Sequence, residues 1–398
     1  MIIHLLTIPC RFLLVSLSID AILEEVTVSD RRNKLNQMSK GDGLGDVYAK
    51  TLERIKAQKG PRPDFGMKAL MWLAYSERPL HASELCSALG VKIGSTDSDP
   101  DLGDVPKIET LLGRSLGLIT LEKSSATVRL VHFTLRDHLS NTPTLFEKPH
   151  SMIAEICLTY LHFRSVWALQ SSSRPVISKF PLLDYASCYW ERHARREMTE
   201  DVKKLVLSLL NGFGRHISSS ILLRHGYYYT IRRMSSLLQQ DWYRGFTCLH
   251  WTAALGMSKM TSTLLEMKEW DLYVTDATGN TAIAWAARMG HKDILKKLLE
   301  QNNTDPNIAD NDGRTSLSWA AWQEDEELVN ILLEREDINL DPVHHDGRTP
   351  LLWAASMGHE EAVKLILERK DAAFGLASNG GIPAAPLPSL MPLPLTLR

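Results

Sequence analysis

The chain has 398 residues, which is long enough for two or three domains. With 44% hydrophobic residues, 23% charged residues and a formal net charge of −2, no overall charge draws it to nucleic acid or to an anionic membrane. The five cysteines lie far apart and form no CxxC pair, which excludes a disulfide framework and a zinc site. We therefore expect a reducing, cytoplasmic location.

The N-terminal segment, MIIHLLTIPCRFLLVSLSIDAIL, is apolar enough to suggest a signal peptide. It has no basic segment before the apolar run, however, and His4, Pro9 and Arg11 interrupt it. No stretch reaches the roughly 18 uninterrupted apolar residues of a membrane span. We expect a buried helix or strand of a core here, and no membrane partner.

Residues 65–145 have the pattern of a compact domain. Two short helices are expected on either side of the turn at Arg78–Pro79, and a third over VPKIETLLGRSL. Two β-like runs follow, GLITLEK and TVRLVHFTL, separated by Ser124–Ser125. Three helices followed by a small two-stranded wing are the winged-helix arrangement.

The stretch VRLVHFTLRDHL holds two histidines, an arginine and an aspartate, and could be catalytic, metal-binding or structural. We expect His132 on the second strand, partly buried, with Arg136 and Asp137 paired at the start of a following helix. A metal site would need ligands from elsewhere, for which His193 is the isolated candidate. We expect no catalytic residue, no metal ligand and no cofactor.

DNA binding by the winged helix would need a basic surface. Basic residues do not outnumber acidic ones in residues 61–143, and Lys107 and Arg114 of the third helix are accompanied by Asp104 and Glu109. We expect a protein-packing module and no nucleic-acid partner, which leaves a DNA-binding regulator as the least favoured reading.

Residues 147–240 read as a helical spacer. PLLDYASCYWERHARRE places Leu183, Ala186 and Trp190 on one helix face, with arginine and histidine on the other. TEDVKKLVLSLL follows, with Thr199 as the N-cap and acidic residues in the first turn.

A 34-residue repeat is the strongest signal in the chain. Four columns keep this spacing: Trp251, Trp285, Trp319 and Trp353; Gly245, Gly279, Gly313 and Gly347; Thr247, Thr281, Thr315 and Thr349; and the apolar pairs that end at Ile366–Leu367. Each unit gives a glycine turn, a helix capped by threonine and a second amphipathic helix. Neither helix can bury its apolar stripe alone, so the units must stack.

This unit resembles the ankyrin repeat, whose Thr-Pro-Leu-His, paired alanines and Gly-His recur here, most closely in DGRTPLLWAASMGHEEAVKLILE. The third unit replaces Gly-His by Glu324–Asp325, and the first lacks the proline. We predict four repeats over residues 241–372. The glycine- and proline-rich residues 373–398 are expected to form a disordered tail.

SERPLHASELCSAL and VRLVHFTLRDHL resemble the winged-helix domain that follows the nucleotide-binding NACHT domain in fungal NLR-like signalling proteins, a domain type named after GPI inositol-deacylases. The resemblance implies a NACHT remnant at residues 1–60, a winged helix at 61–146 and a spacer at 147–240. No GxxxxGK[ST] loop is present, and GDGLGD at Gly41 has no lysine. In related switch proteins the histidine of this motif faces a nucleotide phosphate, a role open to His132 only beside a nucleotide domain.

The ankyrin resemblance implies a concave surface, built from turn tips and inner helices, that binds a protein partner. The expected binding residues are Thr278, Asn280, Arg288, Met289, Asp312, Arg314, Trp322, Gln323, His345, Arg348, Ser356 and Met357. Trp322 is the expected anchor, because binding energy concentrates in Trp, Tyr and Arg. The repeated tryptophans are expected in the core. Residues 241–371 hold 13 basic and 23 acidic side chains, a net charge of −10 that suits a basic or mixed-charge partner.

The sequence thus predicts a non-enzymatic, intracellular adaptor of the NACHT–ankyrin type, with a protein partner on the ankyrin concave face and a NACHT-type protein as a further partner. The alternative is a truncated or degenerate NTP-dependent switch whose nucleotide-binding domain is missing.

Overall fold

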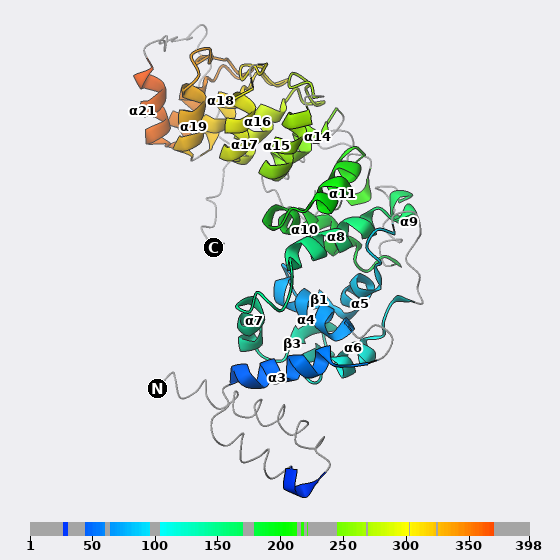
Figure 1. The fold of residues 1–398 in the computed structure, drawn as a ribbon. Coiled ribbons are helices and arrows are strands. Elements are labelled where there is room, and N and C mark those ends of the chain that lie inside the picture. The colour runs from blue at the N-terminus through cyan, green and yellow to red at the C-terminus, as the bar shows by residue number, and fades with distance from the viewer. Residues whose placement is uncertain are drawn as a thin grey trace, which may run out of the picture. The chain divides into compact units, whose positions relative to one another are not determined.

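The computed structural model describes residues 27–30, 44–59, 64–95, 104–169, 179–212, 216–218, 221, 245–267, 270–301, 303–323 and 325–369. The chain divides into two compact units, residues 1–270 and 271–398. Within the described residues, helices dominate both units and the strands form one small sheet in the first (Figure 1). The mostly helical fold class expected from the sequence is confirmed.

The winged-helix region contains the three expected helices, which are α4 (Phe65–Tyr75), α5 (Ala82–Gly90) and α6 (Ile108–Arg114). A further helix, α3 (Leu44–Lys56), precedes them and packs against α4. The core is apolar: Leu70, Trp72 and Leu85 are fully buried. The three expected helices are therefore present and share one apolar core.

The wing consists of β2 (Ile119–Glu122) and β3 (Thr127–Leu130), paired antiparallel with Ile119 opposite Leu130. A third strand, β1 (Leu80–His81), pairs with the other edge of β3, so the sheet order is β1-β3-β2. The sequence predicted two strands; β1 is only two residues long, too short to show an alternating pattern.

The second strand is shorter than predicted, and His132 does not lie on it. Helix α7 (Phe133–Ser140) starts directly after the strand, with His132 as its N-cap. The His132 imidazole accepts a hydrogen bond from the Thr134 amide, which satisfies one of the unpaired donors at the helix start. Arg136 donates to the backbone carbonyls of Ala74 and Ser76, a different partner from the Asp137 that we expected.

The spacer forms four described helices, namely α8 (Pro149–Leu161), α9 (Arg164–Trp167), α10 (Leu183–Arg196) and α11 (Glu200–Leu210). Both α10 and α11 pack along α8. Thr199 caps α11 as predicted, because its hydroxyl accepts from the Val202 amide. On α10, however, His193 is fully buried with Trp190, so the prediction that histidine lies on the outer face is wrong there.

His193 is buried because it belongs to a polar chain that joins the winged helix to the spacer. The Glu77 amide donates to the Tyr185 hydroxyl oxygen (3.0 Å), and this hydroxyl lies 3.0 Å from His193 Nε2. His193 Nδ1 in turn lies 2.8 Å from His150 Nδ1. If Tyr185 donates to His193 and His193 donates to His150, then Tyr185 and His193 each donate one hydrogen bond and accept one. The Glu77 carboxylate pairs with Arg192 and Arg196 beside this chain.

The first repeat belongs to the first unit. Its helices, α14 (Cys248–Leu255) and α15 (Ser258–Met267), pack together, and α14 also packs against α11 of the spacer. The Cys248 thiol donates to the side-chain carbonyl of Asn211 at the end of α11 (3.2 Å). The spacer therefore covers the N-terminal side of this repeat.

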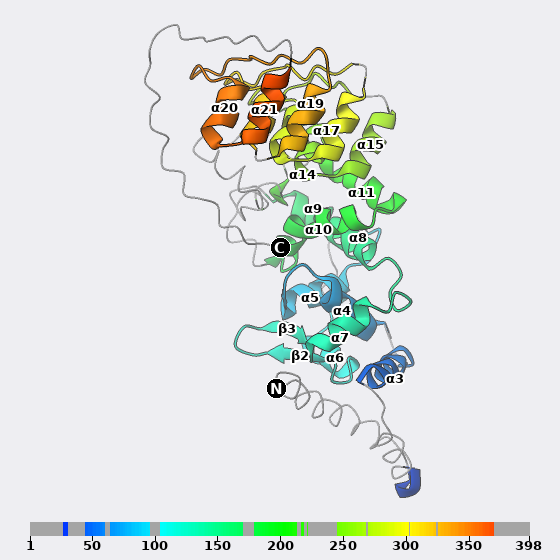
Figure 2. The ribbon, with the colours of Figure 1, turned by 90° about the vertical axis from the view of Figure 1, so that its left-hand side faces the viewer.

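The second unit holds three described helix pairs. The first is α16 (Ala282–Met289) with α17 (Lys292–Leu299), the second is α18 (Ser316–Trp322) with α19 (Glu326–Leu333), and the third is α20 (Pro350–Met357) with α21 (Glu360–Glu368). Helix α18 packs between α16 and α20, and α19 packs between α17 and α21. Figures 1 and 2 show these helices in two layers, with the turns gathered along one edge. This is the stacked solenoid that the repeat predicted.

The caps follow the repeated residues. Thr281 and Thr349 accept from amides three residues later, and Gly290 and Gly358 end α16 and α20 with positive φ angles of 77°. Such a conformation favours glycine. In the third repeat Glu324 stands at the position of this glycine, and α18 ends one residue earlier, at Trp322, followed by Gln323 in an extended conformation.

Two predicted segments lie mostly or wholly outside the described residues: the NACHT remnant at 1–60, of which 27–30 and α3 onward to residue 59 are described, and the tail at 373–398. Among the described helices, none is long and apolar enough to cross a membrane. The four described cysteines, Cys86, Cys157, Cys188 and Cys248, are buried free thiols.

Candidate protein-binding surface

The repeated tryptophans form the inner framework of the array. Trp251, Trp285 and Trp319 are buried, as the fixed column predicted, and Trp353 of the last repeat is half-buried. Four of the predicted binding residues contact the Trp319 side chain, and a fifth, Arg348, lies over the Trp353 ring. The tryptophan column therefore positions the candidate surface.

Trp319 is the centre of the first group of candidates. Its indole Nε1 donates to the side-chain oxygen of Asn280 in the preceding repeat (3.2 Å). The guanidinium groups of Arg288 and Arg314 lie over its ring, at 4.2 and 4.9 Å from the ring centre. The Trp322 ring meets it edge to face at 6.2 Å between centres. The structure thus brings together four residues that the sequence predicted separately.

Arg288 and Asn280 are buried, with only 1% of each exposed. Arg288 is sandwiched between Trp285 and Trp319, and its Nε and Nη1 atoms have no hydrogen-bond acceptor. Burial lowers its pKa to about 10, so the guanidinium stays charged near neutral pH. Both side chains were predicted to face a partner, but the structure places them inside the array, where they bind neighbouring repeats.

The other ten candidates are at least partly exposed. His345 and Ser356 are exposed, and the half-buried ones are Thr278, Met289, Asp312, Arg314, Trp322, Gln323, Arg348 and Met357. The repeat position of Trp322 is variable, because it holds Ala254, Arg288 and Ser356 in the other repeats. It remains the best candidate for an anchor.

The second group surrounds Trp353. The Arg348 guanidinium lies 4.6 Å from the centre of its ring, and the Ser356 hydroxyl donates to its backbone carbonyl. Trp353 Nε1 has no hydrogen-bond acceptor. The position equivalent to Asn280, which accepts from Trp319 Nε1, is occupied by Arg314, whose guanidinium cannot accept a hydrogen bond. Arg314 and Arg348 each pair with an aspartate two residues away, Asp312 and Asp346, at 3.2 and 3.5 Å. The surface therefore presents paired charges on aromatic faces.

The residues that shape the turns were not predicted from the sequence. Asp276 Oδ1 accepts from the amides of Thr278 and Asn280, and Asp276 Oδ2 accepts from Trp285 Nε1 (2.7 Å). Asp310 Oδ1 likewise accepts from the amides of Asp312 and Arg314 in the next turn, and burial raises the pKa of this carboxyl. The two aspartates are 34 residues apart, and this spacing was the available signal.

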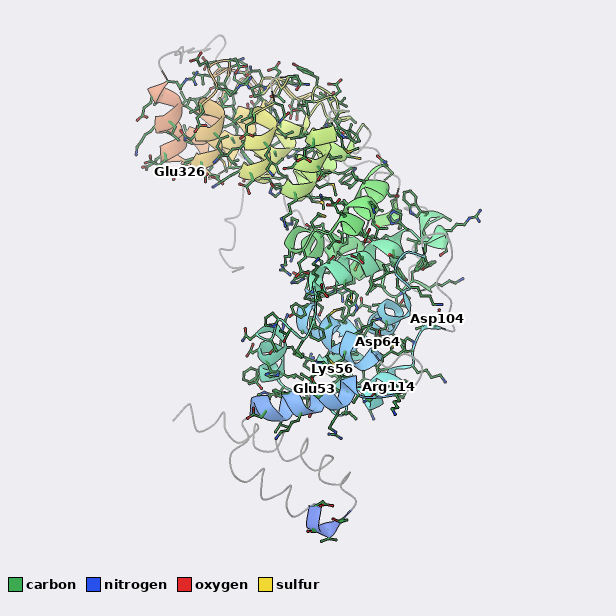
Figure 3. All side chains as sticks on the ribbon, in the orientation of Figure 1. Glu53, Lys56, Asp64, Asp104, Arg114 and Glu326 are labelled. Carbon is green, nitrogen blue, oxygen red and sulfur yellow. The ribbon has the colours of Figure 1, made fainter. Side chains whose placement is uncertain are left out.

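Asp325, Glu326 and Glu327 of the acidic run line a groove of about 600 Å³ at the starts of α19 and α21. Glu326, labelled in Figure 3, is exposed, and Glu360 and Glu361 lie on the other wall. Asp325 and Glu327 are neutralised in part by Lys292, at 2.9 and 2.8 Å. Acidic side chains at helix starts also complement the helix dipole, so the run has a local structural role.

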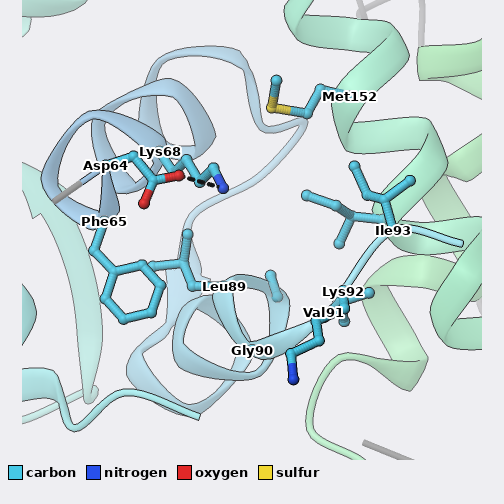
Figure 4. Close-up of a pocket in the computed structure, with 11 residues that line it drawn as sticks. Asp64, Phe65, Lys68, Leu89, Gly90, Val91, Lys92, Ile93 and Met152 are labelled. Atoms are coloured by element: carbon cyan, nitrogen blue, oxygen red, sulfur yellow. Dashed lines mark ion pairs between the residues drawn. The ribbon is translucent and has the colours of Figure 1, made fainter. Parts of the chain in front are cut away.

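The winged helix offers no comparable site in its described part. A hollow of about 350 Å³ lies between α4, α5 and α8 and is mainly apolar (Figure 4). Its two lysines are already paired, Lys68 with Asp64 and Lys92 with Asp104, both at 2.5 Å. The outer side near α3 and α6 carries both signs of charge, including Glu53, Lys56 and Arg114 (Figure 3).

The histidines singled out by the sequence have structural partners. His132 Nδ1 lies 2.8 Å from the Thr134 hydroxyl, which also contacts the Tyr48 hydroxyl at 3.0 Å. His138 packs its ring against Tyr48. Within the described ranges, no group of three or more His, Cys, Asp or Glu side chains is arranged to hold a metal ion.

The comparisons with known families agree with this geometry. Residues 221–310 and 293–376 match the family model of ankyrin repeats. Residues 55–148 match the winged helix domain of the GPI inositol-deacylase type. The chain thus carries a winged-helix domain of this type followed by ankyrin repeats, and such repeats indicate binding to a protein partner. No curated protein matches the chain.

Proposed function

We propose that the chain is a non-enzymatic adaptor that binds a protein partner through the inner surface of its ankyrin repeats. The observation that carries this proposal is the half-buried Trp322, held edge to face on the buried Trp319 in a position where no other repeat has an aromatic residue. A rigid aromatic side chain loses little conformational entropy on binding, which favours it as an anchor.

The surroundings of Trp322 support a polar, mixed-charge partner. Arg314, Arg348 and Asp312 are partly exposed beside it, and Met289 and Met357 add adaptable apolar contacts. The array has a net charge of −10 over residues 241–371, which favours approach of a partner with basic groups. Binding should accordingly weaken as the salt concentration rises.

The test is an affinity capture with the full-length chain as bait, comparing wild type, Trp322→Ala and Tyr273→Ala. Tyr273 is a matched control because it is an exposed aromatic residue that is not among the inner-surface candidates. We expect Trp322→Ala to lose most of the captured partner and Tyr273→Ala to keep it. Equal capture by both variants, with both folded by circular dichroism, would count against the inner surface.

In the same proposal, the winged-helix half acts beside a NACHT-type nucleotide-binding domain in the cytoplasm. The support is the winged-helix match together with the sequence resemblance to fungal signalling proteins. Co-purification of a NACHT-containing protein that persists in Trp322→Ala would separate this contact from the ankyrin contact.

A further inference from the structure

The last described repeat exposes positions that the preceding repeats bury. Leu299 and Leu333 are 8% exposed, whereas Leu367, at the same position of the last repeat, is 40% exposed. One residue before the tryptophan, Ala284 and Ser318 are 1% and 4% exposed, whereas Leu352 is 52% exposed.

Stacking explains this difference. In the second unit each helix pair before the last is covered by the next pair, as α20 covers α18 and α21 covers α19. The positions that are buried by this contact in the earlier repeats are exposed to solvent in the last described repeat. We call the surface formed by Leu352, Ala355 and Leu367 the end face; Ala355 is also exposed, whereas its equivalent Ala321 is fully buried.

We propose that the end face binds the end face of a second copy of this chain, giving a closed dimer. The end face is apolar and occupies the positions that the preceding repeats pack against the next helix pair, so it can be buried against the helix pair of a second copy. A surface that meets its own copy across a two-fold axis forms a self-complementary contact.

Charge does not oppose this contact. Residues 344–369 contain four acidic and three basic side chains, a net charge of −1, whereas the array as a whole has −10. On α21, Lys364 is paired with Glu361, and its pKa is raised by this contact. The last repeat therefore carries little net charge, so the repulsion between two end faces is small.

The other side of the repeat series cannot supply the matching face. Helix α14 of the first repeat is packed against α11, and Cys248 is hydrogen-bonded to Asn211 there. A head-to-tail contact, which would produce filaments, would have to displace α11. The tail-to-tail contact leaves both α11 contacts intact and closes after two copies.

The experiment is sedimentation velocity on the full chain over a wide range of concentration, with Leu352→Glu/Leu367→Glu as the test variant and Val343→Glu as its matched control. Val343 is 52% exposed but lies in a turn outside the stacking positions. We expect a monomer–dimer equilibrium in wild type and control, weakened by about 100-fold or more in the double variant. Circular dichroism checks that all three are folded.

Three outcomes would overturn the proposal: a wild-type monomer at every concentration, larger species than dimers, or an unchanged dimer in the double variant. The chain truncated after residue 371 is measured in parallel. If only this form dimerises, residues 372–398 cover the end face in the full chain, and the proposal is also overturned.

Discussion

Two contact systems of the molecule use aromatic rings in different ways. At the junction of the winged helix and the spacer, Tyr185 shares hydrogen bonds with His193 and the Glu77 amide. In the ankyrin array, Trp319 is held by Arg288 and Asn280. Unfolding frees the histidine of the junction to take up a proton near neutral pH, whereas the arginine and the asparagine of the array do not change charge there. The difference predicts which part of the chain responds to acid and which responds only to loss of packing.

The largest effect should come from removing the centre of the array. Trp319→Ala removes a ring that is 6% exposed together with the partners of Arg288 and Arg314, and should lower the free energy of unfolding by about 3–5 kcal/mol. Trp353→Ala should cost less, because Trp353 is half-buried. Urea denaturation of both variants measures the difference; equal losses would contradict the central role of Trp319.

Acid should destabilise the first unit selectively. Burial lowers the pKa of His193 to about 3 and of His216 to about 4. Unfolding restores a pKa of about 6.5, so the unfolded state binds more protons below this value, and each such histidine costs about 1.4 kcal/mol per pH unit. Stability is therefore complete above about pH 7 and falls as the pH drops from there towards the folded values.

Glu191 opposes this trend, because burial raises its pKa to about 7 and the folded state keeps its proton. One carboxyl acts against two strongly shifted imidazoles, so the net loss remains. Hydrogen exchange between pH 7 and 5, corrected for intrinsic rates, should show α8 and α10 opening before α16–α19. His193→Gln should reduce the pH dependence, and the exposed His345→Gln should leave it unchanged. Uniform opening in both units would break the comparison.

Two glycines of the array offer a matched pair. Gly279 and Gly347 have the same φ of +81°, but a methyl group at Gly279 would lie 2.7 Å from the Asn311 amide, whereas one at Gly347 meets nothing within 4 Å. Gly347→Ala should cost about 1 kcal/mol for backbone strain alone. Gly279→Ala should cost about 2–3 kcal/mol, because a clash is added. Thermal denaturation checks this order.

The smallest loss of stability is expected on removal of the Tyr185 hydroxyl. Tyr185→Phe leaves the Glu77 amide and His193 Nε2 without their buried partner and should cost about 1–2 kcal/mol. The ring packing against Trp72 is retained in this variant. No change in urea denaturation would show that the hydroxyl has no net role at the junction.

The repeat could be predicted from sequence because each column keeps one residue type in one structural role every 34 residues. The burial of Arg288 and Asn280 could not be predicted, because it depends on Trp319 of the next repeat and polar residues at turns are usually exposed. His193 was misplaced for a similar reason, because its partner His150 lies on another helix. Strand β1 was missed because two residues carry no periodicity.

Four of the five cysteines are buried in the first unit, and residues 271–398 contain none. Burial raises the pKa of the Cys86 and Cys248 thiols to about 11 and that of Cys188 to about 12, so they are poor nucleophiles while the unit is folded. Their reaction with a thiol reagent should therefore follow the opening of the first unit. The rate of thiol modification therefore reports on the unfolding of the first unit alone. The ankyrin helices α16–α21 contain no cysteine and do not contribute to this rate.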